Sequence, residues 1–229
     1  MEILGFKLCK IFLKQPEYYT DRFVSISDDY SACLISKCGC STVTVQGICY
    51  KNGDDISKFH LFENNHLLDA GIDDNNVYIY RTDPFSLTEK LSSNNTNRKN
   101  IAIFRDPVDR FISIMHTKHM NLFGNSLDNL LDFVEKVSNN GEFYKLDQHF
   151  VPQCMFYTLN SIDVFVELKD YGNFCKLNNI PWQLVNKNND DSYKNFKLTE
   201  KQISRIKELY YCDSVLIDNI KSSGRLWNY

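Results

Sequence analysis

The chain of 229 residues has no apolar run long enough to cross a membrane. A membrane-spanning helix needs roughly 20 consecutive apolar residues, whereas the N-terminal stretch MEILGFKLCKIFLKQPEYY is interrupted by Lys7, Lys10 and Lys14. The same lysines distinguish this stretch from an export signal, whose apolar core is unbroken. The sequence therefore predicts a cytoplasmic protein that is not an integral membrane protein.

Long runs of one charge are missing as well. The 26 Lys and Arg residues and the 29 Asp and Glu residues give a formal net charge of −3, and no stretch is strongly basic. General attraction to nucleic acid or to an anionic membrane surface requires a basic excess. We therefore expect no nucleic-acid partner, and any site for an anion must be built locally.

The eight cysteines follow no pattern that assigns them to disulfides or to a metal. A reducing cytoplasm disfavours disulfides. Zinc sites usually pair their thiols at C-x₂₋₄-C spacing within loops, whereas Cys33 falls in an expected strand and Cys49 in an expected helix. A zinc-binding module stays an alternative; we expect instead that Cys38 and Cys40 pack beneath a loop and that no metal is bound.

The residues that are present predict a folded α/β protein. Hydrophobic residues make up 43% of the chain and aromatic residues 14%, and the length suits a single domain, residues 1–229. Clusters rich in β-branched and aromatic residues alternate with helix-like or polar segments, at 32–36, 77–81, 100–105 and 162–168. Such alternation predicts a central, mostly parallel sheet flanked by helices.

Helices are expected at 41–53, 106–120, 126–140 and 198–220. In the second of these segments, Asp106 suits the N-cap and Pro107 the first helical position. Its expected apolar stripe consists of Val108, Phe111, Ile112 and Met115. The last two segments have apolar residues at intervals of three and four, which is typical of helices that cover a core.

The first candidate anion site is the turn between the first expected strand and the first expected helix, with the sequence KCGCST. Such a turn directs backbone N–H groups and the positive end of the helix at one point. Gly39 lets the backbone approach an anion, Lys37 adds a charge, and Ser41 and Thr42 add hydroxyl donors. The pattern predicts a phosphate or sulfate site, and the alternative is a structural turn with a capping serine. The nucleotide P-loop differs, because its lysine follows its second glycine.

The second candidate anion site follows the strand expected at 100–105. Arg105 stands at the end of that strand, where its guanidinium is suited to hold a phosphate with two hydrogen bonds. On the helix that follows, Ser113 lies on the polar side with Asp109 and Arg110. Arg105 and Ser113 are therefore expected to share one anion. The alternative is that Arg105 pairs with a nearby aspartate and that Ser113 has no role.

The two motifs together resemble those of sulfotransferases. KCGCST, residues 37–42, is similar to their 5′-phosphosulfate loop. The sequence RDPVDRFIS, residues 105–113, is similar to their 3′-phosphate motif. The closest likeness is to the carbohydrate sulfotransferases of the Golgi-type group and their bacterial relatives.

Three later segments strengthen this resemblance, because they follow in the family order over residues 31–217. They are DQHFVPQ at 147–153, VFVELKDY at 164–171 and the expected last helix. Phe150 replaces the tryptophan of the family pattern, and Lys169 stands where that pattern is looser. No membrane anchor precedes the motifs, which favours a bacterial, cytoplasmic setting.

The resemblance implies a P-loop-like three-layer sandwich that transfers a sulfuryl group from 3′-phosphoadenosine 5′-phosphosulfate (PAPS) to a carbohydrate hydroxyl, without a metal. By family position, Lys37 stabilises the bridging oxygen and the 5′-phosphate, and Arg105 and Ser113 hold the 3′-phosphate. The phosphosulfate is held by the loop residues Gly39, Cys40, Ser41 and Thr42.

The family also implies a histidine or glutamate as the general base between the two motifs. The segment SKFHLFENNHLLDAG offers His60, Glu63 and His66. Its order and spacing favour His60, followed by His66, and a surface histidine is the alternative for each. His149 is a candidate for the acceptor pocket or a structural residue.

The sequence leaves other functions open. A kinase-like phosphotransferase needs an acidic metal ligand at a strand end, and the sequence places none convincingly. A non-catalytic partner subunit that binds the nucleotide is another alternative. The sequence identifies neither the acceptor, including its sulfated position, nor the oligomeric state.

Overall fold

The computed structural model describes residues 23–35, 37–53, 71–72, 78–79, 97–115, 126–140, 148–156, 159–182 and 197–228. The chain divides into two compact units, which are described separately. The sheet unit comprises residues 21–104, 159–189 and 227–229, and the helical unit comprises residues 1–20, 105–158 and 190–226. The expectation of one domain over residues 1–229 stays a prediction.

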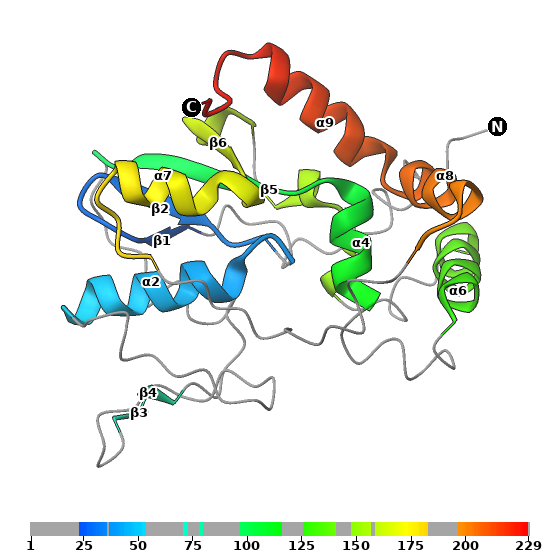
Figure 1. The fold of residues 1–229 in the computed structure, drawn as a ribbon, viewed down its shortest axis with the longest axis horizontal. Coiled ribbons are helices and arrows are strands. Elements are labelled where there is room, and N and C mark those ends of the chain that lie inside the picture. Colours follow the sequence, from blue (N-terminus) through cyan, green and yellow to red (C-terminus); the bar gives the residue numbers. More distant parts are fainter. Residues whose placement is uncertain are drawn as a thin grey trace. The chain divides into compact units, whose positions relative to one another are not determined.

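The sheet unit contains a four-stranded sheet with the order β1-β2-β5-β6 (Figure 1). Its strands are β1 (Phe23–Ser25), β2 (Tyr30–Cys33), β5 (Lys99–Phe104) and β6 (Val164–Glu167). β2, β5 and β6 are parallel neighbours, and β1 pairs with β2 in the antiparallel direction. The prediction of an α/β fold with a mostly parallel sheet flanked by helices is confirmed, although β1 was not predicted.

The parallel register fixes where the loops after the strands begin. Cys33 at the end of β2 lies opposite Ala102 of β5, and Phe104 at the end of β5 lies opposite Glu167 of β6. Because parallel strands end at the same edge of a sheet, the segments that follow β2 and β6 both start at this edge, and so does the continuation of β5.

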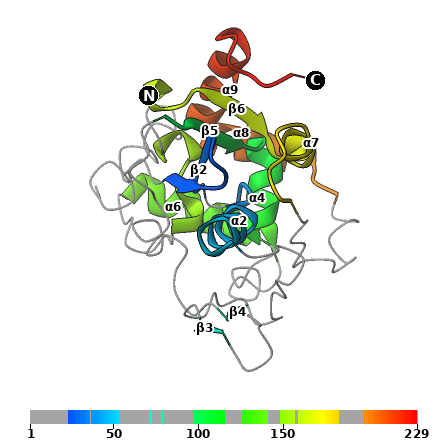
Figure 2. The same cartoon turned by 90° about the vertical axis from the view of Figure 1, so that its left-hand side faces the viewer.

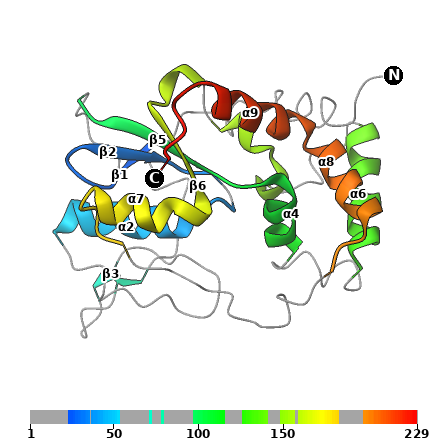
Figure 3. The same cartoon turned by 45° about the horizontal axis from the view of Figure 1, so that its top comes forward.

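Helices α2 (Cys40–Asn52) and α7 (Tyr171–Leu177) pack on one face of this sheet (Figure 3). α2 is seen nearly end-on in Figure 2. Its glycine, Gly47, lowers the intrinsic helix propensity, but it permits a close approach to β1. A Cβ atom at Gly47 would lie 2.0 Å from Cγ1 of Val24. The predicted helix at 41–53 is thus confirmed, and the packing explains its glycine.

The side chains of α2 are buried on nearly all sides, so its polar groups need internal partners. The Gln46 side chain accepts a hydrogen bond from the Tyr171 hydroxyl at 2.6 Å and donates one to the Pro181 carbonyl at 2.9 Å. It also donates to the Cys175 thiol at 3.4 Å. Burial raises the pKa of Cys175 to about 11, so this thiol is protonated and serves in packing.

Two short strands form a separate sheet in the same unit. β3 (Gly71–Ile72) and β4 (Tyr78–Ile79) pair in the antiparallel direction. The sequence predicted a strand at 77–81, and residues 78–79 form one, but its expected place in the main sheet is wrong because β4 pairs with β3. The 3₁₀ helices η6 (Leu159–Ser161) and η7 (Leu168–Asp170) flank β6.

The helical unit contains α4 (Pro107–Met115), α6 (Leu127–Asn140), α8 (Glu200–Leu209) and α9 (Tyr211–Ser222). The 3₁₀ helices η4 (Gln148–Phe150) and η5 (Gln153–Met155) complete its described elements. The single helix predicted at 198–220 is interrupted at Tyr210, whose backbone leaves the helical region with φ −105° and ψ 34°. The buried Tyr210 hydroxyl donates to the Phe150 carbonyl at 3.0 Å, which fixes this interruption.

The predicted stripe on α4 is partly correct. Phe111 and Met115 are buried as expected, whereas Val108 and Ile112 are half-buried. Arg110, which we placed on the polar side, is 1% exposed. The helical wheel missed it because a cation reaches the core only with polar partners from other segments.

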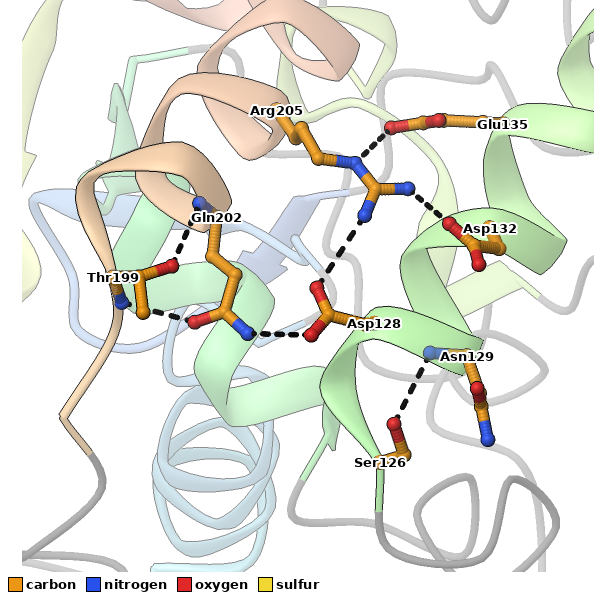
Figure 4. A network of polar contacts seen from close by, with 8 residues as sticks. All are labelled: Ser126, Asp128, Asn129, Asp132, Glu135, Thr199, Gln202 and Arg205. Carbon is orange, nitrogen blue, oxygen red and sulfur yellow. Dashed lines mark hydrogen bonds and ion pairs between the residues drawn. The ribbon is translucent and has the colours of Figure 1, made fainter.

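An ion-pair network joins α8 to α6 (Figure 4). Arg205 contacts Glu135 at 2.7 Å, Asp132 at 2.5 Å and Asp128 at 3.4 Å. Gln202 donates to Asp128 at 3.2 Å and, with Thr199, forms the capping box that begins α8. The hydrogen bond to Glu135 is the main cause that raises the pKa of Arg205. One guanidinium therefore neutralises carboxylates that would otherwise repel one another on α6.

Replacement of Arg205 by methionine should lower the free energy of unfolding by about 1–2 kcal/mol, because it removes the attraction and leaves the α6 carboxylates uncompensated. The loss should shrink as salt is added, since salt screens partly exposed charges. Chemical denaturation at low and high salt measures both effects. Lys201→Met on the exposed side of α8 is the matched control, and an equal loss in the two variants would contradict this role of Arg205.

Candidate functional site

The turn after β2 leads directly into α2. Lys37 and Gly39 have positive φ values of 65° and 84°, and α2 begins at Cys40. The Val43 N–H donates to the Gly39 carbonyl at 3.1 Å, which closes the first helical turn. This is the strand-to-helix geometry that the sequence predicted at this loop.

The N-terminus of α2 has the features of an anion site. No side chain caps the helix, and its first turn contains no acidic residue. Its first N–H groups have no partner within the helix, and the helix dipole makes this end positive. Among the described residues, the hydroxyls of Ser41 and Thr42 have no hydrogen-bond partner, and Lys37 is half-exposed beside them in sequence. These donors are suited to a phosphate or sulfate.

Gly39 is needed for the shape of this turn. Its φ of 84° lies in the left-handed region, which L-residues with a side chain adopt at a cost. A Cβ atom there would also lie 3.0 Å from Cδ1 of Leu168, the first residue of η7. The segment after β6 thus packs against the turn after β2 and leaves little room for a side chain at position 39.

The cysteines of this turn are packing residues, as predicted. Cys38 is buried, and Cys40 is half-buried against the core of the sheet unit. Cys33 and Cys49 are buried in β2 and α2. Within the part of the chain that the structure describes, no three His, Cys, Asp or Glu residues gather in a way that could hold a metal ion.

Replacement of Gly39 by alanine should lower the free energy of unfolding by about 1–3 kcal/mol, through backbone strain and the contact with Leu168. Gly53→Ala is the matched control, because Gly53 has φ 71° and open space around its Cβ position. Chemical denaturation of both variants separates the cost of backbone strain, which both share, from the cost of the contact with Leu168, which only Gly39→Ala makes. The Leu168→Ala background should recover part of the extra loss. A loss at Gly39 no larger than at Gly53 would contradict the contact.

The second predicted site begins directly after β5. Oδ1 of Asp106 accepts from the N–H groups of Val108 at 2.8 Å and Asp109 at 3.2 Å, so Asp106 caps α4 as predicted. Arg105 and Ser113 are half-buried. Among the described residues, neither the Arg105 guanidinium nor the Ser113 hydroxyl has a protein partner. The aspartate pairing that was the alternative for Arg105 is therefore not observed.

Gln153 holds the backbone of Arg105. Its Oε1 accepts from the Arg105 N–H at 3.1 Å, and its Nε2 donates to the Arg105 carbonyl at 2.7 Å. Asp213 in turn accepts from the N–H groups of Gln153 at 3.0 Å and Cys154 at 2.9 Å. Burial raises the pKa of Asp213, and the charge of Arg110, 4.0 Å away, opposes this.

No role was predicted for Gln153 or Asp213, although both lie in segments that resemble the family. The available signal was a charged residue, Asp213, at a position of the last helix that the apolar spacing places on the core side. A buried carboxylate requires partners, and the segment at 147–153 supplies part of them.

A charged pair lies at the end of β6. Glu167 and Lys169 form an ion pair at 2.8 Å, and the hydrogen bond and charge of Glu167 raise the pKa of Lys169. The unusual Lys169 is thus an exposed partner of Glu167 in the segment where Leu168 packs against Gly39.

The remaining candidates are less fully described. His60, Glu63 and His66 lie outside the described residues, so the identity of the general base stays a prediction. His149 is half-buried in η4, and its carbonyl accepts from Arg110 at 3.2 Å. The loop of residues 37–42 belongs to the sheet unit, whereas Arg105 and Ser113 belong to the helical unit.

Comparison with known proteins gives one family. A model described as the sulfotransferase family matches residues 21–156, which is more than half of the chain. The chain belongs to the sulfotransferase family. No curated protein and no solved structure matches it.

The sulfotransferase match includes both anion motifs and Gln153, and it ends before β6 and α9. As a member of this family, the chain is a transferase of sulfuryl groups. Among the described residues, no helix is long and apolar enough to cross a membrane.

Proposed function

We propose that this sulfotransferase moves a sulfuryl group from PAPS to a hydroxyl of a carbohydrate. The main support is the parallel pairing of β2 with β5. Each strand is followed at its carboxyl end by a helix N-terminus. Ser41 and Thr42 after β2 and Ser113 after β5 have hydroxyls without a partner among the described residues, and Arg105 directly follows β5. Two such ends of neighbouring strands suit a donor with two separate phosphate groups.

The roles of the residues follow from their chemistry. The N–H groups of residues 39–42, with the Ser41 and Thr42 hydroxyls, hold the 5′-phosphosulfate. Arg105 and Ser113 hold the 3′-phosphate, for which a guanidinium is suited. Lys37 neutralises the charge that develops on the bridging oxygen.

The reaction is an in-line displacement at sulfur. The acceptor oxygen forms a bond to sulfur as the bond between sulfur and the bridging oxygen breaks. The electron pair stays with adenosine 3′,5′-bisphosphate, and the acceptor proton passes to a base. Such transfers depend mainly on positioning and charge neutralisation. The base, for which His60 and His66 are our candidates, the carbohydrate acceptor and the cytoplasmic location stay predictions.

The donor assignment predicts a preference for the 3′-phosphate. Wild-type protein should bind adenosine 3′,5′-bisphosphate more tightly than 5′-AMP or ATP, and Arg105→Ala should lose about 10–100-fold of that preference. Isothermal titration calorimetry of the three nucleotides measures it. Lys99→Ala, at the other end of β5, should keep the preference. Equal affinities for all three nucleotides, or an unchanged preference in Arg105→Ala, would reject PAPS as the donor.

The catalytic assignment predicts a loss of transfer without a loss of folding. Lys37→Ala should lower the transfer of labelled sulfate from PAPS to a panel of glycans by about 10²–10³-fold. Lys51→Ala, at the C-terminal end of α2, is the control. Unchanged transfer by Lys37→Ala would contradict the role of Lys37. Nucleotide binding by the wild type with no transfer to any acceptor would favour a non-catalytic partner subunit.

A further inference from the structure

We infer that Gln153 is a positioning residue, which sets the direction of Arg105 and thereby the preference for a 3′-phosphate. This inference rests on the proposed function and adds a residue to it. Arg105 lies where the strand pairing ends. The last register pair between β5 and β6 is Phe104 with Glu167, and Arg105 follows.

The carboxamide of Gln153 pairs with Arg105 as a neighbouring strand would. It accepts from the Arg105 N–H at 3.1 Å and donates to the Arg105 carbonyl at 2.7 Å. In extended backbone, the N–H and C=O of one residue point to the same side. One side chain with an acceptor and a donor therefore fixes both backbone groups of Arg105. Asp106 and Pro107, which begin α4, fix the residues that follow.

Gln153 itself is held rigidly. It is fully buried, and both carboxylate oxygens of Asp213 accept backbone N–H groups at the start of η5. Arg110 donates to the Val151 carbonyl at 2.6 Å and to the His149 carbonyl at 3.2 Å. Segment 149–154 is thus tied to α4 by Arg110 and to α9 by Asp213. Such a satisfied buried network restricts a site to one geometry.

The backbone and the side chain of Arg105 differ in their hydrogen bonding, which supports separate roles for Gln153 and Arg105. The backbone of Arg105 is fully hydrogen-bonded, whereas its guanidinium has no partner among the described residues. An arginine whose backbone is fixed and whose guanidinium has no partner among the described residues is preorganised for an anionic ligand. Arg105 supplies the charge that binds the 3′-phosphate, and Gln153 fixes the direction in which the Arg105 side chain leaves the backbone.

The test compares Gln153→Met with a matched substitution at another buried glutamine. Gln153→Met keeps the approximate side-chain length and removes both hydrogen bonds to Arg105. Gln46→Met makes the same change at a glutamine that is 1% exposed and bonded to Tyr171, Cys175 and Pro181. The measured quantity is the ratio of the affinity for adenosine 3′,5′-bisphosphate to the affinity for 5′-AMP, because general destabilisation affects both nucleotides.

Gln153→Met should lower this ratio about tenfold, and Gln46→Met should leave it unchanged. An unchanged ratio in Gln153→Met, with a reduced ratio in Arg105→Ala, would overturn the inference and leave the donor assignment intact. A wild-type ratio of one would overturn both the inference and the donor assignment.

A second variant covers the case in which Gln153→Met does not fold. In Gln153→Glu, the protonated carboxyl keeps one donor and one acceptor, whereas the carboxylate repels the Arg105 carbonyl. Relative to wild type at the same pH, the ratio should therefore fall as pH rises. A ratio that follows the wild type at every pH would overturn the inference.

Discussion

The parallel pairing of β2, β5 and β6 is the constraint on which the functional elements depend. Its register places the ends of these strands at one edge of the sheet, where Cys33, Phe104 and Glu167 precede the functional segments. The loop after β2 turns through two residues with positive φ into α2, and the segment after β6 packs against this loop through Leu168. The backbone after β5 continues into Arg105, whose hydrogen bonds come from Gln153 instead of from a strand.

Buried polar groups perform related tasks in the two units. In the sheet unit, Gln46 satisfies partners on α7 and so holds α2 against α7. In the helical unit, Gln153 fixes the backbone of Arg105, and Asp213 with Arg110 fixes Gln153. Unsatisfied buried polar groups are destabilising, so these networks stabilise the folded positions of α2 and of the Arg105 backbone.

The sequence predicted much of this arrangement because the functional motifs are local. The turn around Gly39, the cap at Asp106 and the first-turn proline each depend on neighbours in the chain, and all were predicted. The burial of Arg110 and the interruption at Tyr210 were not predicted. Both depend on residues such as Phe150 and Asp213 that are distant in sequence, which a helical pattern does not contain. The strand predicted at 77–81 was assigned to the wrong sheet. Its composition suits a strand, but composition does not determine which strand it pairs with, and its pairing lies in another sheet.

The central claim is that two strand ends hold the two phosphate groups of one donor. The most direct measurement is a crystal structure of the protein with adenosine 3′,5′-bisphosphate. We expect the 5′-phosphate at the N–H groups of residues 39–42, and the 3′-phosphate within hydrogen-bond distance of the Arg105 guanidinium and the Ser113 hydroxyl. A 3′-phosphate bound away from Arg105, or a nucleotide that leaves the 37–42 loop without an anion, would contradict the claim.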